Sequence, residues 1–279
     1  MPVEAYHRPT TLDDALALNA EHASLEVISG GTLTMPAVNE GHLFPAHVMD
    51  LRGVGLDYVD EADGHLSLGA TLTMTEVLDR IDVPILRQAA RHTGSWAVRN
   101  MATVGGNLFA PPPLGDFAVA LLALDAAVEV RSSDADRHLP MADFYTADGN
   151  ALAPDELVTE IRIPVPAGET AFLKLTRKQE PAPPVVTVAV DLIRDGDTVD
   201  RARIAMNGAG PHPTRMAEAE SVLEGSGLSA STIERAADAA TEAANPPEDA
   251  VASAWYRRKM AGTYLTKALD QISHGEDTQ

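Results

Sequence analysis

Two short segments of the chain combine paired glycines with threonine, a combination suited to binding an anion. The first glycine segment is Ser29-Gly30-Gly31-Thr32, and the second glycine segment is Ala102-Thr103-Val104-Gly105-Gly106-Asn107. Glycine lets main-chain N–H groups approach phosphate oxygens closely and adopts the positive φ that turns these groups toward a ligand. Threonine adds a hydroxyl donor without adding charge. The two segments therefore predict two loops that hold one anionic ligand.

Each segment taken alone also fits a tight turn. Gly-Gly is a frequent turn sequence, and asparagine tolerates the left-handed conformation that such turns use. A single glycine-rich match is a weak signal of ligand binding. On these residues alone, both interpretations stay open.

Charge and hydropathy exclude several classes of function. A formal net charge of −20 over 279 residues argues against nucleic-acid binding, which needs clustered Lys and Arg. No apolar run approaches the ~20 residues of a membrane span. Met1-Pro2-Val3-Glu4 does not resemble an export signal, so we expect a cytoplasmic protein. The nine histidines include no pair at convincing metal-ligand spacing, and we predict no metal site.

The chain contains no cysteine. It can therefore form no disulfide, no thiolate zinc site and no cysteine-ligated iron–sulfur cluster. Any redox centre is expected to be an organic cofactor or to lie on another chain. The length predicts about two domains.

A predicted helix and strand precede the first glycine segment, and a second strand and a β-hairpin follow it. Residues 11–21 are expected to form a helix with a threonine cap. A short strand over 25–28 leads directly into the first glycine segment, and 47–51 is a second strand candidate. A β-hairpin is expected over 56–69, with Asp63-Gly64 at its turn.

Two helices are predicted between the two glycine segments, and a further helix follows soon after the second. Thr73-Met74-Thr75-Glu76 matches a capping box that begins a short helix, and a further helix is expected over 84–93. The proline-rich run 110–115 is unsuited to a helix or a central strand. Asp116 is then expected to cap an almost wholly apolar, buried helix over 117–125.

The pattern changes along the second half of the chain. Strands are expected over 128–131 and 157–163. Beyond residue 170, three strands over 172–177, 185–194 and 198–207 are followed by three helices over 214–224, 229–244 and 251–270. Pro164, Pro166 and Gly168 form a plausible linker before residue 170. Strands followed by helices predict an antiparallel sheet with helices on one face, an α+β unit.

Four segments together resemble a known family. They are residues 29–36, residues 98–107 with Gly115-Asp116 following, residues 208–215 and residues 252–258. These segments are similar to the FAD-binding medium subunit of molybdenum hydroxylases, the family of carbon monoxide dehydrogenase and xanthine dehydrogenase. The similarity extends almost from end to end, and the second glycine segment with its aspartate is the specific part.

The resemblance implies an α+β fold of two domains. The FAD-binding domain is expected over residues 1–168, as two α+β subdomains over about 1–52 and 53–168. A small C-terminal domain is expected over residues 169–279, with a three-stranded antiparallel sheet and three helices. The pattern of strands and helices beyond residue 170 agrees with the second part of this expectation.

The resemblance also implies which residues bind the cofactor. The implied FAD residues are Ser29, Gly30, Gly31, Thr32, Leu33, Thr34, Ala102, Thr103, Gly105, Gly106, Asn107, Asp116 and Lys174. Amides and hydroxyls of 29–34 and 103–107 are expected to hold the FAD pyrophosphate, which neutral donors can stabilise without a lysine cluster. Asp116 is expected to accept hydrogen bonds from FAD, with a plain helix cap as the alternative. Lys174 is expected near the flavin end, with a solvated strand lysine as the alternative.

The resemblance implies an oxidoreductase subunit without a catalytic acid or base for hydroxylation. A molybdenum-cofactor large subunit would oxidise the substrate, and [2Fe-2S] clusters on a small subunit would deliver electrons through FAD to NAD, a quinone or oxygen. A heterotrimer, or its dimer, is the expected assembly. Two alternatives stay open: a stand-alone FAD-dependent oxidoreductase of the same fold, and a flavin-free scaffold subunit.

One segment departs from the family pattern. Glu180-Pro181-Ala182-Pro183-Pro184 stands where many relatives have an aromatic or polar residue and an aspartate. By the resemblance, this segment lies near the isoalloxazine ring. Its three prolines predict a stiff loop and altered access for the electron acceptor.

Overall fold

A computed structural model of the chain describes residues 3–22, 24–179 and 181–275. Glu180, from the proline-rich segment singled out above, lies outside the described residues. The chain forms two compact units. The first unit contains Met1–Ile81, Ser95–Ala110 and Ala126–Pro164, and the second contains Asp82–Gly94, Pro111–Asp125 and Val165–Gln279. Two segments from the first half of the chain therefore belong to the same unit as Val165–Gln279.

The first unit contains a three-stranded parallel sheet in the order β1-β3-β2. Its strands are β1 (Ala5–His7), β2 (Leu25–Ile28) and β3 (His47–Asp50), and helix α1 (Leu12–Glu21) connects β1 to β2. The side chain of Thr11 caps α1, as predicted. Because parallel strands end at the same edge of a sheet, the first glycine segment begins at an edge where ligands commonly bind.

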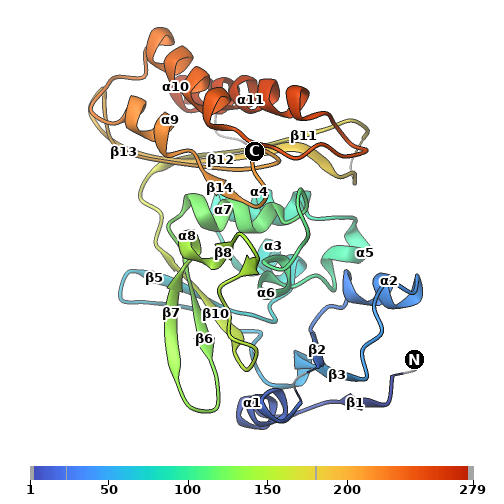
Figure 1. Ribbon diagram of the computed structural model, residues 1–279. Coiled ribbons are helices and arrows are strands. Elements are labelled where there is room, and N and C mark those ends of the chain that lie inside the picture. The colour runs from blue at the N-terminus through green and yellow to red at the C-terminus, as the bar shows by residue number, and fades with distance from the viewer. Residues whose placement is uncertain (1–2, 23, 180, 276–279) are drawn as a thin grey trace. The chain divides into compact units, whose positions relative to one another are not determined.

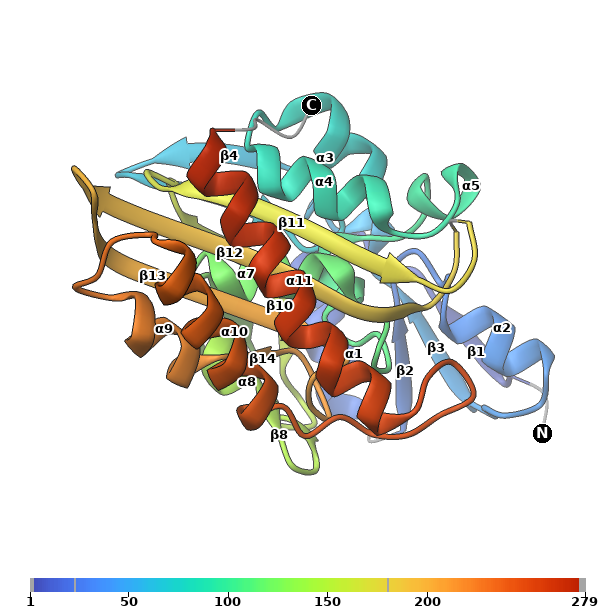
Figure 2. The ribbon, with the colours of Figure 1, turned by 90° about the horizontal axis from the view of Figure 1, so that it is seen from above.

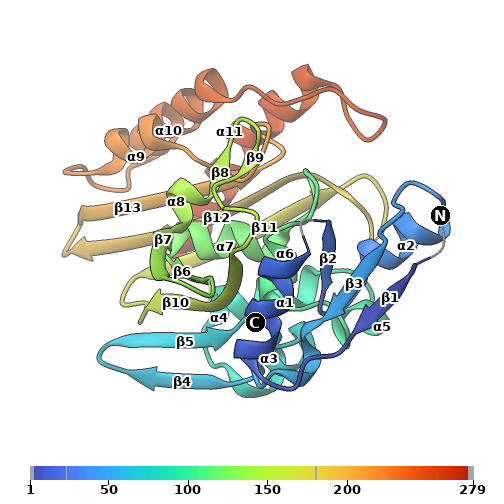
Figure 3. The ribbon, with the colours of Figure 1, turned by 60° about the horizontal axis from the view of Figure 1, so that its bottom comes forward.

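An antiparallel sheet of five strands forms the rest of the first unit's framework (Figure 3). In spatial order the strands are β4 (Val59–Ala62), β5 (His65–Gly69), β10 (Leu157–Pro164), β6 (Ala127–Arg131) and β7 (Asp136–Pro140). The β4–β5 hairpin turns at Asp63 and Gly64, both with positive φ, as the sequence predicts. A small hairpin of β8 (Tyr145–Thr146) and β9 (Gly149–Asn150) follows the short helix α8 (Met141–Phe144).

Short helices complete the first unit. They are α2 (Thr34–Asn39), the 3-10 helix η1 (Leu51–Gly53), α3 (Met74–Arg80), α5 (Trp96–Arg99) and α6 (Val104–Asn107). The capping box predicted at Thr73 and Glu76 is formed in both directions at the start of α3. Helices α2 and α5 are too short to show a periodic pattern and were not predicted.

The second unit is built on an antiparallel sheet in the order β11-β12-β13-β14. Its strands are β11 (Glu169–Thr176), β12 (Pro184–Asp195), β13 (Thr198–Asn207) and β14 (Thr214–Arg215). Helices α9 (Ala217–Leu223), α10 (Ala230–Ala243) and α11 (Ala254–His274) cover one face, and α4 (Pro84–His92) and α7 (Asp116–Ala123) lie on the other (Figure 1). Viewed from above, α11 crosses β11 and β12 (Figure 2). Because helices cover both faces, β12 is buried from Pro184 to Leu192.

The structure corrects two details of the prediction. The helix expected from residue 214 begins at Ala217, because Thr214 and Arg215 pair with β13 as a fourth strand of the sheet. The buried helix expected after Asp116 includes Asp116 itself, and Gly115 is its N-cap, with φ 95°. Asp116 therefore does not cap the helix, because its carboxylate binds other side chains.

In the described part of the chain, no helix is both long enough and apolar enough to cross a membrane.

Candidate functional site

The first glycine segment presents unused hydrogen-bond donors. Within the described residues, the main-chain amides of Gly30, Gly31, Thr32 and Leu33 donate to no protein acceptor. The Ser29 Oγ is buried and also has no hydrogen-bond partner among these residues. Gly31 has φ +63°, the left-handed conformation that turns successive amides toward one side. A buried donor without a partner is costly to a protein, and here the buried Ser29 hydroxyl stands beside four amides that are free among the described residues. Together these donors indicate a binding site for an anion.

The two glycine segments lie against each other. A Cβ on Gly30 would stand 1.7 Å from the carbonyl oxygen of Met101, the residue directly before the second glycine segment. Only glycine allows the two main chains to come this close. The sequence predicted that the two loops act on one ligand, and the structure brings them together within the first unit.

The second glycine segment uses its amides inside the protein. Val104 N donates to Leu72 O and Gly105 N to Ala70 O, each at 2.9 Å. The side chain of Thr103 caps α6 by accepting from Gly106 N at 3.2 Å. A Cβ on Gly105 would stand 2.8 Å from the Cβ and O of Ala70. The second glycine segment is therefore a helical turn packed against its neighbours, and its amides beyond Thr103 are already engaged.

Other groups of the second glycine segment are also hydrogen-bonded or buried within the first unit. Asn107 N donates to Thr103 O at 3.0 Å, and the Asn107 side chain is buried. Ala102 O accepts from Met74 N at 2.9 Å. These bonds fix the segment beside Gly30 and leave the first glycine segment as the richer source of free donors.

Exposed apolar side chains border the two segments. Leu33, Met35 and Met101 are large hydrophobic residues with about two fifths of their surface accessible. Exposed apolar groups next to hydrogen-bond donors suit a ligand that joins an anionic group to rings. Sequence reasoning did not single out Met35 or Met101, although both lie in the segments that carry the family resemblance.

Asp116 and Lys174 form a buried ion pair in the second unit. Lys174 Nζ lies 2.7 Å from Asp116 Oδ2, and the two side chains are 4% and 6% exposed. Thr187 Oγ1 donates to Asp116 Oδ1 at 2.8 Å, and Lys174 Nζ also donates to His92 O at 2.9 Å. Burial raises the pKa of the Asp116 carboxyl, while Lys174 and Thr187 oppose this rise by stabilising the charged form.

The ion pair decides two open questions from the sequence. Lys174 is not a solvated strand lysine, and Asp116 is not a helix cap. Both oxygens of the Asp116 carboxylate bind side chains of β11 and β12. The pair therefore anchors the first turn of α7 to the sheet. Just before α7 in the chain, Pro113 O and Leu114 O accept hydrogen bonds from Asn207 Nδ2 at 2.7 and 2.6 Å.

Arg257 fixes the start of β12, at the last residue of the proline-rich segment. Its side chain is fully buried, donates to the carbonyls of Pro184 and Val185, and pairs with Asp249 at 2.7 Å. Arg257 belongs to one of the segments that carry the resemblance. The structure shows that it holds main-chain carbonyls of β12.

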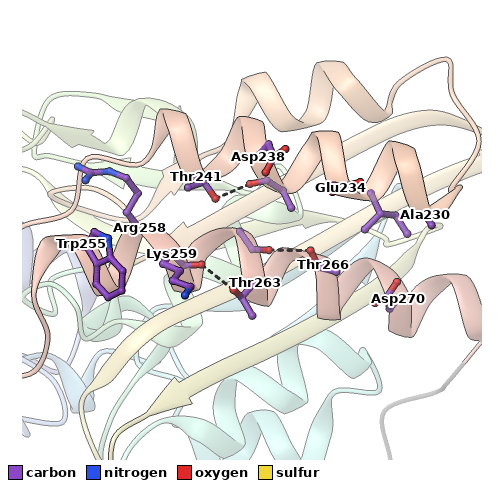
Figure 4. Close-up of a pocket in the computed structure, with 13 residues that line it drawn as sticks. Ala230, Glu234, Asp238, Thr241, Trp255, Arg258, Lys259, Thr263, Thr266 and Asp270 are labelled. Carbon is purple, nitrogen blue, oxygen red and sulfur yellow. Dashed lines mark hydrogen bonds between the residues drawn. The ribbon is translucent and has the colours of Figure 1, made fainter.

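A separate groove of about 650 Å³ lies between α10 and α11 (Figure 4). The hydroxyls of Thr241, Thr263 and Thr266 donate to carbonyls of their own helices. Lys259 Nζ lies over the ring of Trp255, 5.5 Å from its centroid. No predicted FAD residue lines the groove.

The predicted site residues divide between the two units. Those of the two glycine segments, with Leu33 and Thr34, belong to the first unit, and Asp116 and Lys174 belong to the second. The neutral donors belong to the first unit, and the buried charged pair belongs to the second.

Comparison with known proteins gives matches along nearly the whole chain. Residues 2–166 match the FAD binding domain in molybdopterin dehydrogenase. Residues 170–272 match the CO dehydrogenase flavoprotein C-terminal domain.

Individual proteins match over most of their length. The glyceraldehyde dehydrogenase medium chain of Sulfolobus acidocaldarius is 28% identical, covering 98% of this chain and 99% of the relative. The carbon monoxide dehydrogenase medium chain of Afipia carboxidovorans is 30% identical, covering 95% of each chain. A solved carbon monoxide dehydrogenase from Hydrogenophaga pseudoflava, lacking the Mo-pyranopterin moiety of the molybdenum cofactor, aligns with a TM-score of 0.93 at 27% identity and covers 98% of both chains.

Proposed function

The chain belongs to the FAD-binding medium subunits of the molybdenum hydroxylases, and from this premise we propose how its residues hold FAD and which partners it serves. The family membership confirms the resemblance that the sequence motifs indicated, together with the flavoprotein oxidoreductase class and the α+β fold of a FAD-binding and a C-terminal part. The stand-alone oxidoreductase stays as an alternative for the experiment below.

The unpaired donors of the first glycine segment carry the proposal. The Ser29 hydroxyl and the amides of Gly30, Gly31, Thr32 and Leu33 have no acceptor among the described residues. A diphosphate supplies the missing acceptors and needs no lysine beside it. Thr34 Oγ1 donates to Glu26 Oε1 at 3.3 Å, so the neighbouring hydroxyl is held by β2. These groups fit the pyrophosphate of FAD.

The remaining predicted residues have supporting roles in the proposal. Thr103, Gly105, Gly106 and Asn107 build the helical turn that follows Met101 and Ala102, the residues next to Gly30, and Ala102 ties this turn to α3. We propose that these residues contribute to FAD binding by fixing the shape and position of the second glycine segment.

Asp116 and Lys174 are proposed FAD residues on the family pattern. Their charged groups bind each other at 2.7 Å. Lys174 Nζ donates to Asp116 Oδ2 and His92 O and has a third N–H donor, and the Asp116 carboxylate has further lone pairs, so Lys174 can donate to FAD and Asp116 can accept from it while the ion pair stays intact.

FAD, when bound, supplies the redox chemistry that carries electrons from iron–sulfur clusters to NAD, a quinone or oxygen. The chain itself has no cysteine to ligate such a cluster. We therefore propose a small [2Fe-2S] subunit and a large molybdenum-cofactor subunit as partners, in a heterotrimer or its dimer. The names of the relatives, which are medium chains of dehydrogenases, support this assignment.

The first experiment reconstitutes the purified chain with FAD. We expect one FAD per chain, measured by flavin absorbance after removal of free cofactor. A chain that stays colourless contradicts the FAD role and favours the flavin-free scaffold. Turnover of an organic substrate by the isolated chain favours the stand-alone enzyme instead.

A sharper experiment removes one hydroxyl. Ser29→Ala is expected to weaken FAD binding by about 10- to 100-fold, the value of a hydrogen bond to a charged group. Because the hydroxyl is buried without a partner, the stability of the FAD-free variant should be unchanged or higher. Ser24→Ala, on an exposed turn of the same unit, is the matched control. Equal FAD affinity in all three proteins would contradict a hydrogen bond from the Ser29 hydroxyl to FAD.

The proposed partners and location have separate tests. Co-expression with flanking genes for a large and a cysteine-rich small subunit should give a complex that co-purifies, and its mass gives the stoichiometry. The proposed location is the cytoplasm, which cell fractionation tests. Purification of the chain without either subunit from its native cell contradicts the proposed assembly.

A further inference from the structure

Three histidines from distant parts of the sequence meet on the first unit. His7 is the last residue of β1, His47 is the first residue of β3, and His22 is the C-cap of α1. One ring nitrogen from each lies within 4.8 Å of the others. All three side chains are partly buried, so the rings are held by the fold and are still reachable from solvent. We call these residues the histidine cluster.

The backbone explains why the rings share one face of the sheet. Ala5 pairs with His47 in register, and successive side chains of a strand alternate between faces. His7, two residues after Ala5, therefore lies on the same face as His47. Met49 lies on this face too and belongs to the core that α1 covers with Ala15 and Leu16. The end of α1 brings His22 to the two strand histidines.

The rings contact each other directly. His7 Nε2 and His47 Nδ1 are 3.1 Å apart and share a hydrogen bond. The rings of His22 and His47 stack with centroids 4.3 Å apart, and those of His7 and His22 are 5.2 Å apart. In a tetrahedral site with Zn–N bonds of 2.0–2.1 Å, two ligand nitrogens are separated by about 3.3 Å. The spacing of the first pair already matches this separation.

Nearby charges favour a cation at the histidine cluster. The C-terminal end of α1, where His22 lies, carries the negative end of the helix dipole. Arg8 directly follows β1, and its guanidinium lies 4.0 Å from Asp50. Asp50 is three residues after His47 in β3, on the opposite face of the sheet. Arg8 is therefore directed away from the cluster.

We propose that the histidine cluster is a binding site for a divalent transition-metal ion, with Zn²⁺ as the ion that fits it. Three neutral imidazoles suit zinc and its neighbours in the first row and do not suit Ca²⁺ or Mg²⁺, which prefer oxygen ligands. Three protein ligands leave the fourth position to water. Binding turns the stacked rings until their nitrogens converge and breaks the His7–His47 hydrogen bond. The ion then ties β1, β3 and α1 together.

The histidine cluster is distinct from the proposed FAD site. His47 begins β3, whereas the first glycine segment follows the end of the parallel strand β2. The two features therefore lie toward opposite edges of the three-stranded sheet. Zinc binding can be tested in FAD-loaded protein without reference to electron transfer.

The experiment uses untagged FAD-loaded protein, stripped of metal with a chelator and titrated with Zn²⁺ against a chromophoric competitor. We expect one ion per chain with a dissociation constant of roughly micromolar or below. His22→Gln and His47→Gln should each weaken binding by about 100-fold or more. His42→Gln, an exposed histidine that pairs with Glu40 outside the cluster, is the matched control and should bind zinc like the wild type.

A second measurement does not depend on the variants folding. Zn²⁺ added to the ¹⁵N-labelled wild type should shift the imidazole signals of His7, His22 and His47 and leave that of His42 in place. Co²⁺ should give the visible absorption of a four-coordinate site with nitrogen ligands. The proposal is overturned if the wild type binds no zinc in this range, or if His22→Gln binds it with unchanged affinity.

Discussion

The Cα of Gly30 faces the main-chain carbonyl of Met101 so closely that a Cβ would lie 1.7 Å from the carbonyl oxygen. The close approach joins the two glycine segments of the first unit. It gives Gly30 a packing role that neither a turn nor a phosphate loop predicts from sequence. The glycine therefore links the geometry of the proposed FAD site to the stability of the unit.

Gly30→Ala is expected to separate the two segments, since the obstacle is main chain and cannot rotate away. We expect a loss of at least about 2 kcal/mol in unfolding free energy, as for an overpacked core site, together with loss of bound FAD. Thermal unfolding and flavin absorbance measure the two effects. Gly227→Ala is the control, because its nearest obstacle lies 3.3 Å away. Retention of FAD with wild-type stability would contradict the close contact.

The Lys174–Asp116 ion pair is buried, so removing one partner leaves a charge without compensation. Lys174→Met is expected to lower the unfolding free energy by about 3–5 kcal/mol. A double variant with Asp116→Leu should recover much of that loss, because it removes both charges. Urea unfolding measures both, and Lys178→Met, at an exposed position, is the control. If the double variant loses the sum of the two single changes, the residues do not act as a pair.

The FAD affinity of the same variants tests whether the residues of the ion pair also bind FAD. A decrease in Lys174→Met that the double variant does not restore indicates that Lys174 binds FAD directly. Unchanged affinity in every folded variant assigns Asp116 and Lys174 to the anchoring of α7 alone.

Asp50, at the end of β3, makes the stability of the first unit sensitive to acid. Burial raises the pKa of its carboxyl, but hydrogen bonds from Arg52 and Tyr6 outweigh burial and lower the pKa from 3.8 to about 2. Because the folded value is depressed, the unfolded chain binds the proton first, and the stabilisation is present above about pH 4 and lost as pH falls toward 2.

Asp50→Asn should therefore be less stable than the wild type by about 2 kcal/mol near neutral pH, and this difference should shrink between about pH 4 and pH 2. Urea unfolding at several pH values measures it. Asp60→Asn, an exposed carboxylate on β4, should show no comparable change. A difference that stays constant with pH contradicts the titration of Asp50.

The stability of the protein is expected to depend on the guanidinium of Arg257, and not only on its positive charge. Arg257→Lys keeps the charge but loses the fork that serves Asp249 and two carbonyls of β12, so we expect a loss of about 3 kcal/mol. The adjacent Arg258→Lys is the matched control, because Arg258 is half-buried and its side chain donates one hydrogen bond within residues 3–22, 24–179 and 181–275, from Nε to Ala244 O. Similar stability of the two variants, measured by thermal unfolding, contradicts the anchoring role.

Local signals were sufficient for most of the fold. Thr11 caps α1, Thr73 and Glu76 form a capping box, and Asp63-Gly64 turns the β4–β5 hairpin, because each depends on residues three or fewer positions apart. Predictions failed where a distant segment intervened. Thr214 and Arg215 look like the start of a helix, yet they pair with β13. Asp116 looks like a cap, yet Lys174 and Thr187 bind its carboxylate.

The sequence alone determined the family, the candidate FAD residues and the absence of cysteine, because motif residues and composition do not depend on packing. Only the tertiary structure decided which donors remain free. It engages the amides of Val104 and Gly105, leaves those of Gly30 and Gly31 without acceptors in the part of the chain that the structure describes, and gathers three histidines that lie far apart in sequence. The physical reason is that a hydrogen bond or a ligand set is made between segments, and their juxtaposition exists only after the chain has folded.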